Sequence, residues 1–308
     1  MEQSLEKKSP IYTKTKKRKK SFWLSSRVLF IVPAIIYILT IFAFPVYRSI
    51  VMGFQDFSIS SIGTGNYPFI GLENYKELFS QPLMWKVLLN TILFVLGSIV
   101  FQLSIGMALA IFFTKKFPLN GFIRSMLLVP WLLPLIVSGT AFRWIFNQSH
   151  GVLNWALMKM HLIQEPIGWL VSPDTALMST IITNIWVGIP FSMVIFYSGL
   201  QDIPKELYEA GSIDGCNAWQ KFWYITIPSL RPVIAIVLTL ALIYTLKVFD
   251  VIMILTGGGP ANSSQILSTW SYDLSFQQLS FGQGAAVSNI MIVISLFFSY
   301  FYLKATKE

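Results

Sequence analysis

The sequence predicts an all-α integral membrane protein with six transmembrane helices. Hydrophobic residues make up 54% of the 308 residues, charged residues only 12%, and the mean hydropathy is +0.62. A soluble domain carries about 25% charged residues. Six apolar runs are near or above the roughly 20 residues that a bilayer requires. We therefore expect one transmembrane domain over residues 27–308, preceded by a basic tail over residues 1–26.

The first apolar run, Val28–Tyr47, follows this basic tail. A basic segment before an apolar run resembles a signal peptide, but this run exceeds the usual 7–15 residues and no small-x-small cleavage site closes it. We expect an uncleaved first span, with Pro45 at its outer end. The tail also has the composition of segments that contact anionic lipid.

The second and third spans follow a mixed, partly aromatic loop over residues 50–84. The apolar runs predict helices over Trp85–Phe113 and Phe122–Ile145. Pro130 and Pro134 lie inside the third span. Because proline removes a backbone donor and clashes with the preceding turn, we expect this span to be kinked or broken.

The last three spans are separated by two outer segments and one central loop. An outer segment over residues 146–175 contains a short amphipathic piece around Val152–Met160, and residues 256–282 are expected outside. The three predicted spans are Ala176–Ser198, Val233–Leu255 and Gly284–Leu303.

Basic residues favour one orientation of these spans. Nine of the 23 Lys and Arg residues lie in the first 27 positions, three at 115–124, three in the central loop over residues 200–232, and two at the C-terminal end. The opposite segments hold only Arg48, Lys76, Lys86, Arg143 and Lys159. Since short cytoplasmic segments carry the excess of Lys and Arg, both termini and the central loop are expected in the cytoplasm.

The central loop is a polar stretch between two long apolar runs. Pro204 suits the start of a helix, where its missing N–H is no loss. Gly211 and Gly215 either leave one face of that helix without bulky side chains or end the helix, because glycine allows close backbone packing and tight turns. Asn217 is suited to start a second short helix. The loop is thus predicted to be a helix–turn–helix at the cytoplasmic face, suited to being held by a partner outside the membrane.

The spacing within this loop resembles a known motif. Glu209-Ala210-Gly211, then Gly215, Ile225 and Ile227-Pro228, is similar to the EAA loop of permeases of binding-protein-dependent ABC importers. The family pattern is Glu-Ala-Ala, three residues, Gly, nine residues, Ile, one residue, Leu-Pro. Both spacings hold here, while Gly211 replaces the second Ala and Ile227 replaces Leu.

Two further segments resemble the sugar permeases of this family. Residues 69–75, FIGLENY, are similar to an F-x-G-L-x-N-Y turn of maltose-type permeases, and they favour the first of the two permease subunits. Residues 247–260, KVFDVIMILTGGGP, resemble a K-x-F-D-x-I-x-x-L-T-x-G-G-P stretch.

The resemblance implies the type I ABC importer permease fold in a bacterial cytoplasmic membrane. It implies a second, different permease chain, two cytoplasmic ATPases that bind ATP and Mg, and an external solute-binding protein. Such a complex imports a sugar, most often an oligosaccharide. The helix at 204–215 would sit in a cleft of one ATPase and move with it. The residues assigned to this coupling are Glu209, Ala210, Gly211, Asp214, Gly215 and Pro228.

The fifth span lines the translocation path in the family that the chain resembles. Lys247 and Asp250, three apart, are expected to share a helix face there. Ionisable groups at membrane depth either line cavities or pair with each other. The alternative to a role in the path is therefore that Lys247 and Asp250 form an internal pair that fixes helix packing. The candidate path residues are Asn184, Trp186, Tyr244, Lys247, Asp250, Ser288 and Asn289.

Other kinds of chemistry find little support in the sequence. No G-x-x-x-x-G-K-[ST] or H-E-x-x-H motif occurs, so we expect no nucleotide, cofactor or metal site and no enzymatic activity in this chain. The single cysteine excludes an intrachain disulfide, and no aromatic residues interleave with the basic cluster of the tail, as an RNA-binding segment would require.

Two other transport functions stay open. A permease of the same fold could carry a non-sugar solute such as glycerol phosphate, although no extra Arg lies near the middle of spans two to six. A secondary transporter would show inverted repeats and ion-coupling carboxylates, for which Asp250 alone is thin support.

Overall fold

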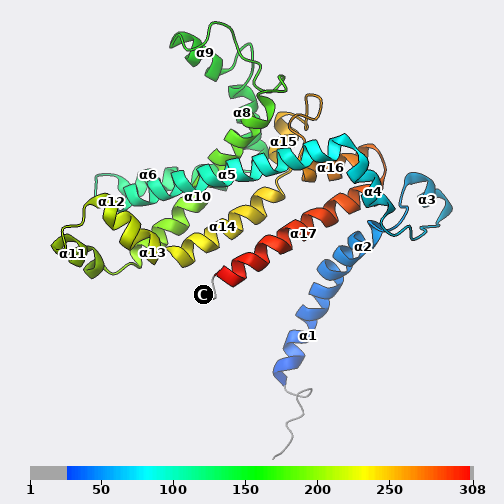
Figure 1. Cartoon of the computed structure of the whole chain (residues 1–308), viewed down its shortest axis with the longest axis horizontal. Coiled ribbons are helices and arrows are strands. Elements are labelled where there is room, and N and C mark those ends of the chain that lie inside the picture. Colours follow the sequence, from blue (N-terminus) through cyan, green and yellow to red (C-terminus); the bar gives the residue numbers. More distant parts are fainter. Residues whose placement is uncertain (1–25, 306–308) are drawn as a thin grey trace, which may run out of the picture. The chain divides into compact units, whose positions relative to one another are not determined.

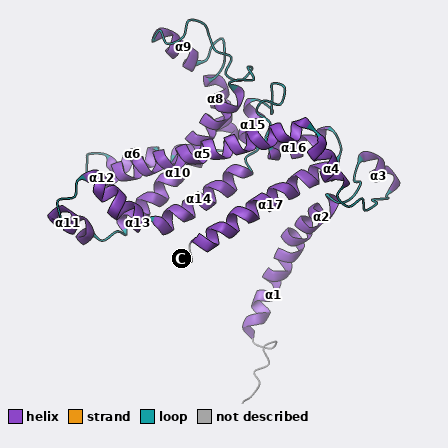
Figure 2. Ribbon diagram, in the orientation of Figure 1, coloured by secondary structure: helices purple, strands orange, loops and turns teal. Residues whose placement is uncertain are grey.

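A computed structural model of the chain describes residues 26–305, and the predicted basic tail therefore lies almost wholly outside the described residues. The chain divides into two compact units, residues 1–48 and residues 49–308. Within the described range the regular structure is helical (Figure 2), with one isolated β-bridge between Gln55 and Phe69. The all-α prediction is confirmed.

The first span is longer than the sequence predicts. Helix α1 (Ser26–Ile38) continues through a π-helical turn, η2 (Leu39–Ala43), into α2 (Phe44–Met52). The expected end at Pro45 is wrong, because the helix passes through this residue. In the π turn the N–H of Phe44 bonds to the carbonyl of Leu39, and this wider turn directly before Pro45 relieves the clash that its ring would cause in a regular α-helix.

The described residues hold four continuous helical spans and two bent pairs, and the second pair includes residues 218–229 of the central loop rather than the whole predicted span Val233–Leu255. The continuous spans are Ile31–Met52, α5 (Pro82–Thr114), α10 (Ala176–Gln201) and the first 20 residues of α17 (Phe281–Ala305). The bent pairs are Asn120–Leu132 with Leu135–Ile145, at 96°, and Ala218–Ser229 with Arg231–Leu246, at 71°. Counting each pair as one span gives six.

The third span breaks at its prolines, as predicted. It consists of α6 (Asn120–Met126), α7 (Val129–Leu132) and α8 (Leu135–Ile145). Pro130 occupies the first turn of α7 and Pro134 caps the start of α8, the two positions where a missing N–H costs least.

The fifth span is not the single helix Val233–Leu255 that the sequence predicts. Helix α14 (Arg231–Leu246) ends at Lys247, and α15 (Asp250–Leu255) begins after a break of three residues. The hydroxyl of Ser268 donates to the carbonyl of Val248 inside this break. A side chain twenty positions later thus satisfies backbone that the interrupted helix leaves free, as irregular backbone in a membrane requires.

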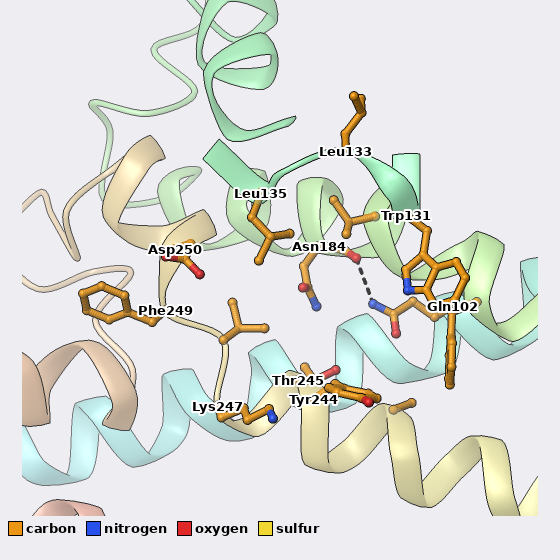
Figure 3. A pocket seen from close by; sticks show the side chains of 15 residues that line it. Gln102, Trp131, Leu133, Leu135, Asn184, Tyr244, Thr245, Lys247, Phe249 and Asp250 are labelled. Carbon is orange, nitrogen blue, oxygen red and sulfur yellow. Dashed lines mark hydrogen bonds between the residues drawn. The ribbon is translucent and has the colours of Figure 1, made fainter. Parts of the chain in front are cut away.

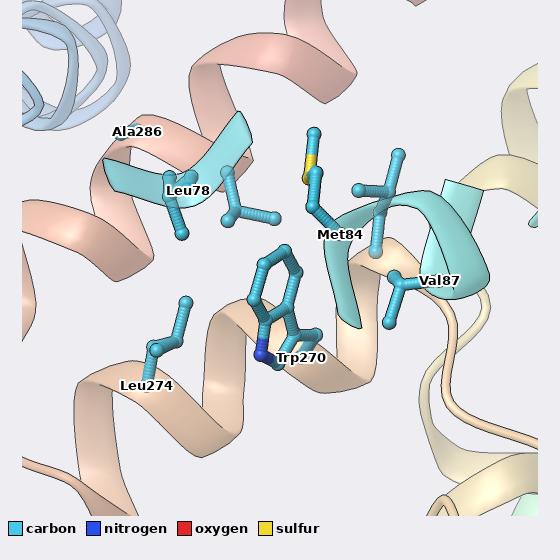
Figure 4. Close-up of a cluster of buried hydrophobic side chains, with 8 residues drawn as sticks. Leu78, Met84, Val87, Trp270, Leu274 and Ala286 are labelled. Carbon is cyan, nitrogen blue, oxygen red and sulfur yellow. The ribbon is translucent and has the colours of Figure 1, made fainter. Parts of the chain in front are cut away.

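The predicted outer segment 256–282 is partly core rather than an open loop. It contains α16 (Leu267–Tyr272) and a π-helical turn, η4 (Asp273–Gln277). Trp270 of α16 is 1% exposed and lies at the centre of a cluster with side chains from α4 (Glu73–Ser80), α5 and α17 (Figure 4). The members of this cluster are Leu78, Met84, Val87, Leu267, Trp270, Leu274, Ala286 and Val287.

The predicted loop 50–84 contains α3 (Ile59–Thr64) and α4, and the F-x-G-L-x-N-Y turn secures it. The Asn74 side-chain amide donates to the carbonyls of Gly53 and Gln55, both at 3.0 Å. Gly71 adopts φ +62°, in the left-handed region where glycine is favoured.

Helices α5, α10, α14 and α17 lie side by side in the second unit (Figure 1). The central loop, with α11 (Lys205–Ile213), α12 (Ala218–Lys221), η3 (Phe222–Thr226) and α13 (Ile227–Ser229), lies at one end of these helices. Helices α4 and α16 lie at the opposite end, and α9 (Val152–Lys159) falls in the predicted amphipathic piece. This arrangement separates two candidate sites, a cavity between the helices and the central loop.

Candidate functional site

A cavity of about 410 Å³ lies among α5, α10, the break between α7 and α8, and the break between α14 and α15 (Figure 3). The break between α7 and α8 and the break between α14 and α15 therefore contribute to one hollow. Its walls are Gln102, Trp131, Leu133, Leu135, Asn184, Val187, Gly188, Phe191, Ala241, Tyr244, Thr245, Lys247, Val248, Phe249 and Asp250.

Two buried amide side chains line this cavity. The Gln102 amide donates to the backbone carbonyl of Asn184 at 2.8 Å, and only 4% of Gln102 is exposed. Gly188 makes this contact possible, because a Cβ there would overlap the Gln102 side chain. These contacts position Gln102 between α5 and α10.

The side chain of Asn184 has an unused donor. Asn184 is 6% exposed, and its Nδ2 has no hydrogen-bond partner within the described part of the chain. Figure 3 shows this amide pointing into the space near Leu135 and Lys247. A buried N–H without a partner is costly, so the group is suited to bind a polar ligand in the cavity.

Aromatic side chains form another wall. The ring of Phe191 lies 5.8 Å from Trp131 and 5.9 Å from Tyr244 between ring centroids. Lys247 Nζ lies 5.0 Å from the centroid of the Tyr244 ring, a cation–π contact. Since Tyr244 remains 54% exposed, it presents an amphipathic surface to the cavity rather than filling a core.

Lys247 and Asp250 reach the cavity from two separate elements, not from one helix face as predicted. Lys247 ends α14 and Asp250 begins α15. Among residues 31–300, whose side chains the structure describes, the one ion pair joins Lys76 and Glu73, so the structure shows no internal Lys247–Asp250 pair. The cavity therefore holds one cationic and one anionic side chain that are not joined to each other.

Three of the predicted path residues lie outside this cavity. Trp186 packs on Phe142, with ring centroids 5.2 Å apart. Asn289 donates to the carbonyl of Ile50 at 3.0 Å and to the Tyr75 hydroxyl at 2.9 Å, so it joins α17 to the 50–84 segment. Ser288 lines a second hollow, described below.

Sequence reasoning missed several lining residues that come from distant segments. Gln102 is a polar residue in the middle of an apolar span, and that position alone was a usable signal for an internal site. Trp131 and Phe191 carried no comparable signal, because aromatic residues are common throughout the spans.

The central loop forms the helix–turn–helix that the sequence predicts. Helix α11 packs closely on the turn η3, since a Cβ at Gly211 would lie 2.9 Å from Cδ1 of Ile225. Gly215 follows α11 with φ +78°, a conformation that favours glycine. Asn217 caps α12, and its side chain and that of Gln220 bond to each other's backbone N–H.

Two side-chain bonds close the hairpin. The hydroxyls of Tyr208 and Thr226 lie 2.9 Å apart, and Lys221 Nζ lies 2.5 Å from Ser212 Oγ. They connect α11 with the α12–η3 segment, so the loop is one braced unit.

The outer face of this unit is exposed. Glu209, Ala210 and Asp214 are exposed, and Ile213 is 87% exposed. Within the described residues no hydrogen bond or ion pair reaches the carboxylate of Glu209. A face with an apolar residue between free carboxylates is suited to a protein partner.

Residues 102–305 match the family model described as "Binding-protein-dependent transport system inner membrane component". The chain belongs to this family. The sulfoquinovosyl glycerol transport permease SmoG of Agrobacterium fabrum is 34% identical, over 90% of this chain and 89% of the relative. The trehalose/maltose permease MalF of Thermococcus litoralis is 34% identical, over 77% of this chain and 79% of the relative. The lactose permease LacF of Rhizobium radiobacter is 32% identical, over 91% of this chain and 93% of the relative.

Solved structures confirm the fold of this permease. A chain of a bacterial ABC transporter involved in the import of the acidic polysaccharide alginate superposes with a TM-score of 0.76. The alignment covers 90% of the permease and 95% of that chain, at 22% identity. The predictions of an ABC importer permease and of the type I fold are confirmed, while the roles of individual residues remain predictions.

Proposed function

We propose that this permease imports a sugar, and that the cavity among α5, α10 and the α14–α15 break is the site where the sugar passes. The names of the sugar-transporting relatives support this substrate class. The observation that carries the proposal is the buried, unpartnered Asn184 Nδ2 facing a hollow with aromatic walls.

The side chains of the cavity match the chemistry of a sugar. A sugar ring has an apolar face that packs on aromatic rings and a rim of hydroxyls that donate and accept hydrogen bonds. Tyr244 and Phe191 supply the rings, and the amide of Asn184 supplies a donor. Lys247 and Asp250, which also line the cavity, provide a second donor and an acceptor. This mix of apolar walls and a few convergent polar groups is typical of small-molecule sites.

A phosphorylated solute such as glycerol phosphate is less well matched. Phosphate recognition favours several cationic donors, with Arg preferred for bidentate contacts. Lys247 is the only cationic side chain lining the cavity, and Asp250 offsets its charge. The cavity therefore favours an uncharged solute.

Transport is driven through the central loop in this proposal. A separate ATPase holds ATP and Mg and receives α11. The residues at the contact are Glu209, Ala210, Gly211, Asp214 and Gly215. Pro228 turns the chain back to α14. This permease pairs with a second, different permease chain, a second ATPase binds that chain, and an external binding protein delivers the sugar. The central loop and both termini then face the cytoplasm, which agrees with the distribution of Lys and Arg.

The test is purification of the full chain with its co-purifying subunits, followed by reconstitution in proteoliposomes. We expect ATP-dependent uptake of a member of a panel of trehalose, maltose, maltotriose, maltotetraose and lactose in the presence of the external binding protein. Uptake of glycerol phosphate without uptake of any sugar would contradict the proposed substrate. Uptake that follows an ion gradient and persists after ATP depletion would contradict the mechanism.

A further inference from the structure

A second hollow of about 440 Å³ shares one wall residue, Phe249, with the cavity described above. The second hollow is formed by the N-terminal half of α17, by α16 and η4, and by the residues at the end of α2. Figure 1 places α16 and the start of α17 at the end of the helices opposite the central loop.

Hydroxyl groups line this second hollow. Its five serines are Ser49, Ser268, Ser271, Ser275 and Ser288. Ser271 and Ser288 lie 2.8 Å apart, while within the described residues the hydroxyls of Ser49 and Ser275 have no hydrogen-bond partner. A serine hydroxyl both donates and accepts, so the wall can bond to hydroxyls of either orientation.

A continuous run of six aromatic rings, which we call the aromatic ladder, begins at this hollow, and four of its rings line it. From Phe249 it continues to Tyr272 at 4.9 Å, to Phe276 at 5.1 Å and to Phe281 at 6.3 Å between centroids. Phe281 then contacts Phe57 at 5.8 Å, and Phe57 stacks on Tyr67 at 4.5 Å. The ladder thus connects the 50–84 segment with the wall of the first cavity.

The ladder differs from an ordinary hydrophobic core in its exposure. Phe276 is 62% exposed and Tyr272 is 37% exposed, although the neighbouring Leu274 and Trp270 are buried. The turn η4 contributes to this arrangement, because Tyr272 and Phe276 lie four positions apart across a π-helical turn and face the hollow together. The bond from the Gly282 N–H to the Phe57 carbonyl, at 2.8 Å, holds the outer part of the ladder in place.

We infer that the aromatic ladder and its serine wall are a second saccharide-binding site, which receives sugar rings on the outer side of Phe249 before they reach the first cavity. The ring faces supply stacking surfaces in series, and the serines supply hydrogen bonds at their edges. Because Phe249 belongs to both hollows, a chain of several sugar units could occupy the two at once. This inference rests on the proposed sugar transport function and adds to it a second binding site for the oligosaccharide that the family resemblance implies.

The experiment uses the assembled transporter in proteoliposomes, with maltose, maltotriose and maltotetraose as probes. For Phe276→Ala we expect the KM for the longer sugars to rise about three- to tenfold, with a smaller change for the disaccharide. Phe276→Tyr should retain wild-type uptake. Phe276→Leu should behave like Phe276→Ala, because leucine keeps apolar area but has no ring face. Phe122→Ala is the matched control, since Phe122 is 61% exposed on α6, away from the ladder.

The outcomes separate the two proposals. If the wild type takes up these sugars and Phe276→Ala changes none of them, or changes all equally, the second site is refuted while the proposed function stands. If the variant no longer co-purifies with the second permease, the ladder is an interface with that chain, and the inference is likewise refuted. If the wild type takes up none of the panel, the proposed function fails first.

Discussion

Gly211 of α11 lies against Ile225 of the turn η3, so closely that a Cβ on Gly211 would come within 2.9 Å of Cδ1 of Ile225. This contact joins the two arms of the central loop, together with the Tyr208–Thr226 hydroxyl pair. A partner that moves α11 therefore moves η3 and α13 with it, and α13 leads directly into α14. In the proposed coupling, a movement of the loop would reach the wall of the cavity through this contact.

Gly211→Leu is expected to uncouple ATP hydrolysis from transport. A leucine cannot fit at this distance, so α11 must move away from η3, whereas Gly211→Ala requires only a shift of the flexible end of Ile225. In proteoliposomes we expect ATP-dependent uptake to fall more than tenfold in the leucine variant, while the chain still inserts and assembles.

The double variant Gly211→Leu with Ile225→Ala is the matched test of this packing. Removing the Ile225 side chain makes room for the leucine, so uptake should recover in part. Equal loss in the single and double variants would show that Gly211 acts through its outer surface rather than through Ile225.

Glu209→Lys is expected to abolish coupled transport without affecting insertion. The Glu209 side chain is exposed and has no hydrogen-bond or ion-pair partner within the described residues, so reversal of its charge removes nothing that stabilises this chain. A partner that binds the carboxylate would lose a charge-assisted hydrogen bond. Glu165→Lys, the same change on an exposed residue of the outer segment, is the control and should transport normally. Normal ATP-driven uptake by Glu209→Lys would contradict the role given to the central loop.

Gly215→Leu is also expected to abolish coupled transport without affecting insertion, but through the backbone rather than through charge. Gly215 adopts φ +78°, and the left-handed region costs an ordinary residue about 1–2 kcal/mol. No atom lies within 4 Å of a Cβ placed there, so the effect would come from the backbone and not from a clash. Gly63→Leu is the comparison, because Gly63 has equally open surroundings but no positive φ. Uncoupling by both variants, or by neither, would rule out the backbone explanation.

The spans and the central loop were predictable because their signals are local. Apolar runs near 20 residues gave α5 and α10 to within a few residues, and the spacing from Glu209 to Pro228 identified the loop. The break at Lys247–Phe249 was not predictable in this way. Apolar residues continue on both sides of Lys247 and Asp250, so the run reads as one span, and the group that stabilises the break, Ser268, comes from a later element.

The cavity was only partly predictable for the same reason. Asn184, Tyr244, Lys247 and Asp250 were chosen as polar or aromatic residues of two spans, and the structure brings them together. Ser288 and Asn289 satisfied the same criterion but face other partners. Which face of a span borders a hollow depends on the packing of four helices, and that packing is not encoded in the period of one apolar run.

Asn184→Leu is expected to weaken sugar transport without destabilising the chain. Its Nδ2 has no partner within the described residues, so leucine removes an unsatisfied donor and adds apolar contact in a buried position. We expect thermal stability in detergent to be unchanged or higher. The KM for the transported sugar should rise about tenfold, because the bound sugar loses one hydrogen bond. Gln102→Leu should instead lower stability by about 1 kcal/mol, because it removes the bond to the Asn184 carbonyl. Wild-type KM in Asn184→Leu would exclude this residue from the path.

Asn90→Ala is expected to destabilise the segment that follows α15. The Asn90 amide is 7% exposed and donates to the carbonyls of Asn262, Ser263 and Gln265 at 3.0–3.3 Å, and Lys86 Nζ lies 2.8 Å from the carbonyl of Ala261. Alanine would leave these carbonyls without their donor, at a cost of about 1–3 kcal/mol. Hydrogen exchange should therefore speed up over residues 258–268, and the midpoint of thermal unfolding should fall. Gln164→Ala, an exposed amide in the 146–175 segment, is the control and should change neither. Unchanged exchange in Asn90→Ala would mean that the buried contacts of Ile266 and Leu267 hold this segment without the amide.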